Sequence, residues 1–460
     1  MLKNEIKLKN EIMEAARGAI ERNRAAISAL CDTASLADYS YLTKKSEHGT
    51  VWTRALQTAL NSHEVVVIPP SDEIYWIDST VTIPSNTRIE ATGATIRVVP
   101  VYNYVMLRNE NAKDGTFAPI DPSEKDENIS IHGGRWDEGA TGRSVRRYHA
   151  AQDSFMGVQT CMLFSNVKGL TLNDVTFVCA TSFCVQIGNV TDGVFENFSF
   201  ISCFADGLHV NGNCENLYVN NFTGYVGDDL VALNMYDWLG SSINYGPARN
   251  IFCENIHSSP DSEAKAMRLQ PGIFAYPDGV TVDCSINDIY IRNVSGIFEY
   301  KLYFQSPPYC LGAKPEGEGA GSCNNLFFEN IDIVSERLYY PKESDVFGMF
   351  FINSNAGYIS LDRINYTVRE NELPTTYLVA IGPMSYRVKR KTGEEVEVFD
   401  PYISSRVDTL CLSNVTLNGK PCRDARALVK TIEFDDVNCD GFSSGRGEVK
   451  EIYIDGNKVK

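Results

Sequence analysis

A spacing of 23 residues recurs in the middle of the chain and constrains its fold more than any other feature. Three short apolar runs, Val185–Ile187, Leu208–Val210 and Val231–Leu233, follow one another at this interval. Equal spacing of this length is typical of a solenoid, in which each coil places a strand over the corresponding strand of the next coil. The spacing therefore predicts three stacked parallel strands in register.

An apolar phrase that ends in Asn or Asp extends this pattern along most of the chain. The copies are Leu170–Val175, Val194–Phe198 (one residue shorter), Leu217–Phe222, Ile251–Ile256, Ile289–Val294, Leu326–Ile331, Leu410–Val415 and Ile432–Val437. Each copy predicts a short strand that ends in a turn, because Asn tolerates the left-handed backbone conformation. A β-sandwich, the alternative, would show more hairpin signals. We therefore predict an all-β parallel β-helix.

The N-terminal segment has a different periodicity. From Met1 to about Leu30, apolar residues lie three, four or seven positions apart between charged residues, which predicts an amphipathic helix. An open end of a β-helix exposes core side chains and unpaired strand edges. We expect this helix to cap the N-terminal end, so that residues 1–45 form a helical cap and residues 46–460 the catalytic β-helix.

Composition limits the partners and the compartment. The net charge of −17 makes nucleic acid and anionic membrane surfaces improbable partners, and the chain has no run of 18 apolar residues. Thirteen scattered cysteines without a secretory leader indicate reduced thiols and a cytoplasmic location. The six histidines show no metal-ligand spacing, so we predict no metal and no other cofactor. The sequence leaves the oligomeric state open.

Three aspartates are the candidate catalytic residues. Asp206 and Asp229 are one 23-residue repeat apart, and Asp228 precedes Asp229 directly. Stacked strands lie about 4.8 Å apart, so the three carboxylates should meet in space. Like charges in one patch push the pKa values of the carboxyl groups apart, which lets one act as an acid and another as a base.

Polar residues that point out of the same coils form three expected columns. The columns are Asp206, Asp229 and Lys265; Gln186, His209, Ala232 and Arg268; and Asn211, Asn234 and Gln270, with Lys301 on the following coil. A guanidinium beside an ammonium group suits a sugar carboxylate. We predict that the substrate-binding residues are Gln186, His209, Asn234, Lys265, Arg268, Gln270 and Lys301.

These residues also resemble a known family. The run Asp206–Val210 followed by Gly227–Asn234 is similar to the pattern of glycoside hydrolase family 28, the polygalacturonases, and Trp52–Leu60 followed by Val65–Pro70 resembles the start of many pectin-degrading β-helices. The resemblance implies the right-handed, single-stranded parallel β-helix of the pectin-lyase-like superfamily. It also implies that one residue of the pair Asp228 and Asp229 donates a proton while the other two carboxylates activate water.

The chain departs from the family pattern near the expected site. Phe204 replaces the family's Asn two positions before the first aspartate, and Lys265 stands where the family has the His of its G-H-G segment. The family's R-I-K motif has no clean match, and Arg268 and Lys301 are the nearest cations. These departures concern substrate recognition more than the three carboxylates.

The sequence thus predicts an inverting glycosidase that cleaves α-linked galacturonosyl or galactosyl units from pectin-type oligosaccharides. Inversion needs a gap of about 6.5–9.5 Å between acid and base, which stacking at one-coil intervals permits. Two alternatives stay open. In a polysaccharide lyase, the three aspartates would hold Ca²⁺ against a uronate while Lys265 or Arg268 abstracts a proton. The other is a carbohydrate-binding β-helix without catalysis.

Overall fold

The computed structural model describes most of the chain. The described residues are 2–100, 105–143, 160–237, 241–262, 265–303, 319–335, 346–370, 375–385, 388–392, 395–399, 402–436 and 443–460.

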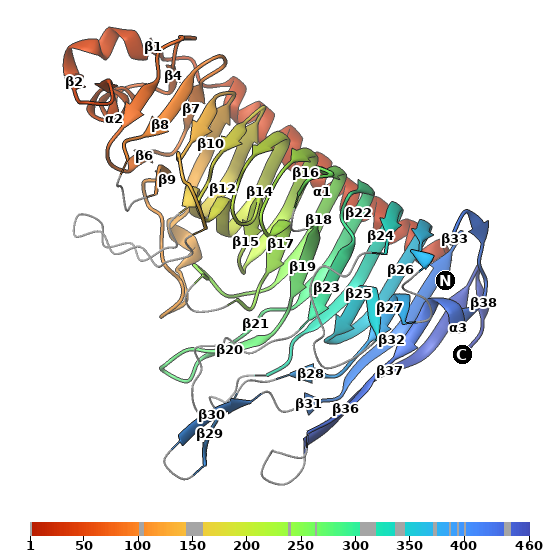
Figure 1. The fold of residues 1–460 in the computed structure, drawn as a ribbon. Helices are drawn as coiled ribbons and strands as arrows, with labels where there is room; N and C mark the ends of the chain where they lie inside the picture. Colours follow the sequence, from red (N-terminus) through yellow and green to blue (C-terminus); the bar gives the residue numbers. More distant parts are fainter. Residues whose placement is uncertain are drawn as a thin grey trace.

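The body of the molecule is a parallel β-helix, as the repeats predicted (Figure 1). Its main ladder stacks β10 (Asp126–His132), β12 (Thr160–Asn173), β14 (Phe183–Ile201), β16 (Cys214–Gly224), β18 (Ala248–Ser258), β22 (Ile286–Ser295), β24 (Ser322–Val334), β26 (Asn355–Thr367), β32 (Ser405–Ser413) and β37 (Ser443–Ile454). Each of these strands pairs with the next in parallel. We call each strand layer of this ladder a rung.

A second ladder runs beside the first and carries the predicted site. It starts from β14 and continues through β15 (Leu208–Val210), β17 (Asp229–Asn234), β19 (Ala266–Gln270), β23 (Glu299–Tyr303), β25 (Phe347–Asn353), β27 (Thr376–Ile381) and β35 (Val429–Thr431), all parallel. Short antiparallel hairpins leave the coils, among them β20 (Ile273–Ala275) with β21 (Thr281–Asp283) and β29 (Val388–Thr392) with β30 (Glu395–Phe399).

The N-terminal coils use shorter strands. They are β1 (Thr33–Ser35), β3 (Thr50–Val51), β4 (Val65–Val67), β5 (Tyr75–Ile77), β6 (Val81–Ile83), β7 (Thr87–Glu90), β8 (Thr95–Val98), β9 (Leu107–Asn109), β11 (Arg135–Asp137) and β13 (Thr176–Val178). Because β1 pairs with β4 inside the same sheet, strand pairing begins before the expected boundary at residue 45. The division into two domains stays a prediction.

Asparagine turns hold the coils in register. The residues that close the repeated phrase have positive φ, for example 57° at Asn221, 57° at Asn255 and 56° at Asn293, which is the left-handed region that Asn tolerates. Their side chains also bond to the coil before: Asn293 Nδ2 donates to Asn255 Oδ1 at 3.1 Å, and Asn330 Nδ2 donates to Asn293 Oδ1 at 2.9 Å. The Asn positions of the sequence pattern thus mark a side-chain ladder.

The expected N-terminal helix is present as α1 (Leu2–Ser28), but its expected position over the end of the solenoid is wrong. It lies lengthwise along the outside of the main ladder (Figure 1). Near its start Glu5 accepts a hydrogen bond from Tyr358 on β26 at 2.8 Å, and near its end Asn23 donates to the Leu170 carbonyl on β12 at 3.3 Å. The first turn of α1 therefore lies over the coil that contains β26, towards the C-terminal end of the solenoid.

The physical reason for this position is an apolar column that faces out from the main ladder. Val194, Tyr218, Phe252, Tyr290 and Phe327 occupy the same register position on successive rungs, and they pack against Ile12, Ala16 and Ala19 of α1. From Glu5 to Asn23 the helix rises about 27 Å, close to the roughly 29 Å of six strand steps. The apolar stripe of α1 and the apolar column of the main ladder therefore have similar lengths along the solenoid axis.

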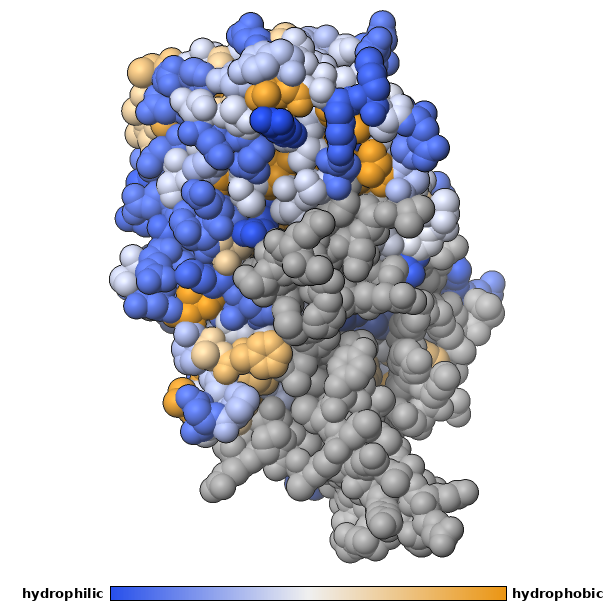
Figure 2. Space-filling view, turned by 90° about the vertical axis from the view of Figure 1, so that its left-hand side faces the viewer, coloured by the Kyte–Doolittle hydropathy of each residue, from blue (hydrophilic) through white to orange (hydrophobic). Residues whose placement is uncertain are grey.

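The N-terminal end is covered by other elements. The helix α2 (Thr53–Leu60) buries Leu56 and Leu60 in the main core, where Leu36 of the 3-10 helix η1 (Leu36–Leu42) joins them. Seen from this end, the described surface is mostly hydrophilic with small apolar patches (Figure 2). These two short helices thus do what the sequence analysis assigned to α1.

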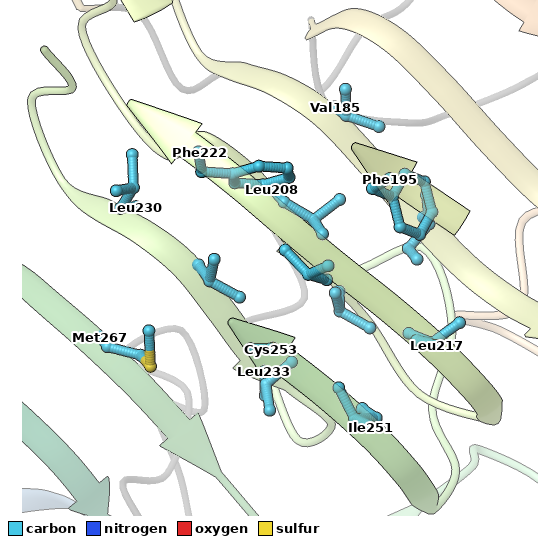
Figure 3. Packing of buried hydrophobic residues seen from close by; sticks show 14 of the residues in the cluster. Val185, Phe195, Leu208, Leu217, Phe222, Leu230, Leu233, Ile251, Cys253 and Met267 are labelled. Carbon is cyan, nitrogen blue, oxygen red and sulfur yellow. The ribbon is translucent and has the colours of Figure 1, made fainter. Parts of the chain in front are cut away.

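The core fills the inside of the coils with one layer of apolar side chains per rung. Val185, Leu208, Leu233 and Met267 point inward from the second ladder and pack against residues of the main ladder such as Leu217 (Figure 3). Among the residues that the structure describes, no helix combines the length and the apolar character needed to cross a membrane.

Candidate active site

The second ladder places the polar column largely as the sequence predicted. Gln186 pairs with His209, His209 with Ala232, Ala232 with Arg268, and Arg268 with Lys301. Because Leu208 and Leu233 in the same strands point into the core, this column points out of the coils. In the third column, Asn234 pairs with Gln270 as expected.

A β-bulge changes the first column. The register shifts between Asp229 and Val231, so Asp229 lies opposite Ala266 and not opposite Lys265. The Lys265 ammonium lies 5.1 Å from the centre of the Phe298 ring. The expected alignment of Lys265 with Asp206 and Asp229 is therefore wrong, because the bulge adds a residue that equal spacing could not reveal.

The three aspartates do meet. One carboxylate oxygen from each of Asp206, Asp228 and Asp229 lies within 4.8 Å of the others. The backbone N–H of Asp229 also donates to Asp206 Oδ1 at 3.2 Å. Asp206 and Asp229 are buried, whereas the side chain of Asp228 is 21% exposed. Solvent therefore reaches the cluster through Asp228.

Two guanidinium groups lie against the aspartate pair. Arg268 Nε lies 3.0 Å from Asp229 Oδ2, and Arg268 Nη2 lies 3.4 Å from Asp228 Oδ1. Arg143, from the segment after β11, donates to Asp228 Oδ2 at 2.5 Å. The contact of Arg268 with Asp229 lacks hydrogen-bond geometry, and both Asp229 oxygens are buried without a hydrogen-bond partner among the described residues.

These surroundings separate the pKa values of the aspartate pair. Burial raises the pKa of Asp229 to about 8, against the opposing charge of Arg268 and with the help of the charges of Asp228 and Asp206. Burial also acts to raise the pKa of Asp228, but Arg268 and Arg143 outweigh it, and the pKa lies below its usual range. At neutral pH this favours a protonated Asp229 beside an ionised Asp228.

Asp206 contacts a buried histidine on its other side. His209 Nδ1 lies 2.6 Å from Asp206 Oδ2, and His209 Nε2 lies 2.8 Å from Asp237 Oδ2. The imidazole stacks on the ring of Phe183 with 3.8 Å between centroids. Burial would lower the pKa of His209, but its hydrogen bonds to the two carboxylates raise it to about 9.

The polar columns are buried beneath residues 235–237 and 241–247, which we call the covering segment. Gln186 Nε2 donates to the Ser241 carbonyl at 2.6 Å and to Asn211 Oδ1 at 2.8 Å. The amide atoms of Asn234 are buried without a hydrogen-bond partner among the described residues. The columns thus point outward, but most of their members form a polar layer below a covering segment instead of an open surface.

Sequence reasoning missed three charged residues at this site. Asp237 lies in the covering segment, outside the repeats, and Arg143 lies in a loop far upstream in the sequence. Glu299 pairs with Lys301 at 3.2 Å, and burial raises its pKa against the charge of Lys301. Glu299 belongs to β23, and the predicted place of Lys301 on the following coil was the signal that could have located it.

The three aspartates also have the spacing of a cation site. Oxygens within 4.8 Å of one another could reach one Ca²⁺ at about 2.3–2.6 Å. However, Arg268 and Arg143 already lie against the oxygens of Asp228 and Asp229 and supply positive charge there. The arrangement is therefore better suited to acid and base chemistry than to holding a divalent ion.

Comparison with known proteins identifies the fold. The exopolygalacturonase from Thermotoga maritima aligns with a TM-score of 0.53 and 10% identity, over 96% of this chain and 97% of that chain. The family 28 exopolygalacturonase from Yersinia enterocolitica aligns with a TM-score of 0.50 and 12% identity, over 93% of this chain and 78% of that chain. This chain has their fold.

A phage protein has the same fold. The E372Q mutant of the tailspike of E. coli bacteriophage HK620, solved in complex with a pentasaccharide, aligns with a TM-score of 0.50 and 12% identity, over 92% of this chain and 79% of that chain. No protein-family model matches the sequence, and no curated protein matches it. The comparisons establish a β-helix that carbohydrate-active proteins share.

Proposed function

We propose that the protein is a glycosidase that cleaves α-linked galacturonosyl or galactosyl units from pectin-type oligosaccharides. The observation that carries the proposal is the cluster of three carboxylates, in which the pKa values of Asp229 and Asp228 are pushed in opposite directions. Pairs of titratable groups whose surroundings separate their pKa values are typical of acid and base roles. The shared fold of the exopolygalacturonases supports the substrate class.

In this proposal Asp229 donates its carboxyl proton to the glycosidic oxygen, and Asp228 accepts a proton from the attacking water. Asp206 holds the water from the other side. Asp229 is fully covered in the structure, whereas the side chain of Arg143 above Asp228 is 47% exposed. Productive binding therefore includes a movement of covering side chains, and Arg143 is the most accessible of them.

The proposed substrate contacts divide into two groups. The side chains of Arg268 and Lys301 are each 17% exposed and lie on neighbouring coils, where they can meet a sugar carboxylate. Gln186, His209, Asn234 and Gln270 are buried below the covering segment, which supports a role in shaping the site. We keep Lys265 as a more distant contact because of its place beside Phe298.

A calcium-dependent lyase is the second candidate, and the mutual distance of 4.8 Å among the carboxylate oxygens favours it. A lyase would need a base that takes a proton from the sugar ring. Arg268 and Arg143, the cations in contact with the aspartate pair, are weak candidates because a guanidinium keeps its proton in proteins. This chemical argument places the lyase second.

The test is product analysis on a panel of galacturonosyl and α-galactosyl oligosaccharides, with and without a chelator. We expect saturated reducing sugars, unaffected by the chelator, and a loss of about 100-fold or more in kcat for Asp206→Asn, Asp228→Asn and Asp229→Asn. Asp192→Asn is the matched control, because Asp192 binds Arg22 of α1 far from the cluster. Unsaturated products that vanish with chelator, or full activity in all three variants, would overturn the proposal.

A further inference from the structure

The His209 side chain lies between two carboxylates, and only one of them belongs to the proposed catalytic set. Asp206 contacts Nδ1 at 2.6 Å, and Asp237 contacts Nε2 at 2.8 Å. A carboxylate accepts hydrogen bonds, so each ring nitrogen must carry a proton to satisfy both partners. With both aspartates ionised, the geometry therefore requires an imidazolium, because a neutral ring has only one N–H.

The surroundings fix this ring in place. The Phe183 ring covers one face at an interplanar angle of 11°, and His209 is 2% exposed. On the far side of the ring, Asn211 Nδ2 lies 3.4 Å from Asp237 Oδ2 and donates to the Asn234 carbonyl at 3.1 Å. Asn211 is held in turn by Gln186 and by the Ile243 N–H, which both donate to its Oδ1.

The charged groups around the ring form a chain that ends at the reaction site. Asp237 and Asp206 contact His209 directly, and beyond Asp206 lie Asp228, Asp229 and Arg268. Burial raises the pKa of Asp206, the hydrogen bond to His209 opposes this rise, and the charge of Asp228 adds to it. The imidazolium and the backbone N–H of Asp229 are thus the groups in contact with Asp206 that favour its ionised form.

We propose that Asp237 and His209 are positioning residues that keep Asp206 ionised and turned toward Asp228 and Asp229. Asp237 Oδ2 accepts a hydrogen bond from the Nε2–H of the imidazolium, and Asp206 Oδ2 accepts one from its Nδ1–H. Asp206 Oδ1 accepts a hydrogen bond from the Asp229 N–H at 3.2 Å. This inference rests on the proposed function for its effect on turnover, although the charge state of His209 can be tested without any substrate.

The first experiment is nitrogen-15 NMR of the full-length protein labelled at histidine. Replacing each of the other histidines by Gln in turn assigns the His209 resonances by elimination. We expect both ring nitrogens to carry protons at pH 7 and one proton to be lost near pH 9, in agreement with the raised pKa of about 9. A ring with one unprotonated nitrogen at pH 7 overturns the proposal.

The second experiment compares pH profiles of kcat/KM for the wild type, Asp237→Asn and the control Asp192→Asn. Loss of a neighbouring positive charge raises a carboxyl pKa by about 1–3 units. The acidic limb of Asp237→Asn should therefore move to higher pH by about that amount, while the limb of Asp192→Asn stays in place. An unchanged limb in an active Asp237→Asn protein contradicts the positioning role.

The two experiments separate the two proposals. If the wild type cleaves no glycan, the proposed function fails, and the NMR measurement still decides the charge of His209. If Asp237→Asn does not fold, the NMR measurement on the wild type decides alone. A purely structural role for Asp237 would lower the stability of Asp237→Asn without moving its acidic limb.

Discussion

At the residue scale, Asp229 combines complete burial with two carboxylate oxygens that have no hydrogen-bond partner among the described residues. The unfolded chain releases this proton near pH 3.8, whereas the folded protein holds it to about pH 8. The folded state therefore binds more protons in this window, and its stability falls as the pH rises from about 4 to about 8. The raised pKa that suits Asp229 to the proposed proton donation therefore lowers the stability of the folded protein at neutral pH.

The first prediction follows from this window. Asp229→Asn should lose nearly all turnover, yet its melting temperature relative to the wild type should increase as the pH is raised from 4 to 8. Asn has a similar shape but no proton to lose. Thermal unfolding of both proteins across this range measures the difference. A constant difference would show that Asp229 has an ordinary pKa in the folded protein.

The second prediction concerns Arg268, which lies against both members of the aspartate pair. If its main role is to hold Asp228 ionised, Arg268→Ala should raise the pKa of Asp228 and lower kcat/KM equally for a galacturonoside and its neutral galactoside analogue. If it binds a sugar carboxylate, KM should rise for the galacturonoside alone. The contacts of Arg268 with both aspartates favour the first result, an equal loss for the two substrates. That result would shift the substrate assignment to neutral α-galactosides.

The third prediction concerns stereochemistry. The carboxylate oxygens approach within 4.8 Å, whereas inverting enzymes separate acid and base by about 6.5–9.5 Å and retaining enzymes by about 5–5.5 Å. The wide gap expected from stacking is therefore absent among these side chains, and inversion now rests on the family resemblance alone. We keep inversion as the prediction. NMR of the first-formed anomer decides it, and initial retention of configuration would contradict it.

At the element scale, the repeat spacing was enough to predict the register of β14, β15, β17 and β19, because strands of a solenoid must stack. Equal spacing could not reveal the bulge after Asp229, which is a local change in pairing. It could not reveal Asp237 or Arg143 either, since both lie in segments outside the repeats. The sequence therefore predicted the meeting of the three carboxylates better than the groups that set their charge.

For the helix α1, the sequence predicted that the helix exists but not where it lies. Its periodicity predicted a buried stripe, but amphipathic character alone does not say which surface the stripe covers. The missing signal was in the repeats, where the outward positions at Tyr218, Phe252 and Tyr290 are aromatic on successive rungs. An aromatic column on the outside of a solenoid must be buried by another element, and here that element is α1.

The fourth prediction tests the position of this helix. Ala16 is buried against the aromatic column, whereas Ala25 on the same helix is exposed. Ala16→Asp should lower the free energy of unfolding by about 3 kcal/mol or more, because it buries an unpaired charge, and Ala25→Asp should change it little. Chemical denaturation of both variants measures this. Equal stability of the two would place α1 away from the main ladder.

At the scale of the whole molecule, a solenoid of this kind offers a long side on which the proposed catalytic residues from several coils meet. Asp206 precedes β15, Asp229 starts β17 and Arg268 lies on β19, so the site needs three consecutive coils in register. The fold is shared with exopolygalacturonases and with a tailspike solved with a pentasaccharide. The fold alone therefore does not separate cleavage of a glycan from binding.

The measurement that tests the central claim most directly is hydrolysis in water enriched in oxygen-18, followed by mass spectrometry of the products. The account predicts that a galacturonosyl or α-galactosyl oligosaccharide gives saturated products with one oxygen-18 at the new reducing end, and that Asp229→Asn gives none. Unsaturated, unlabelled products, or binding of the oligosaccharide without any cleavage by the wild type, would contradict it.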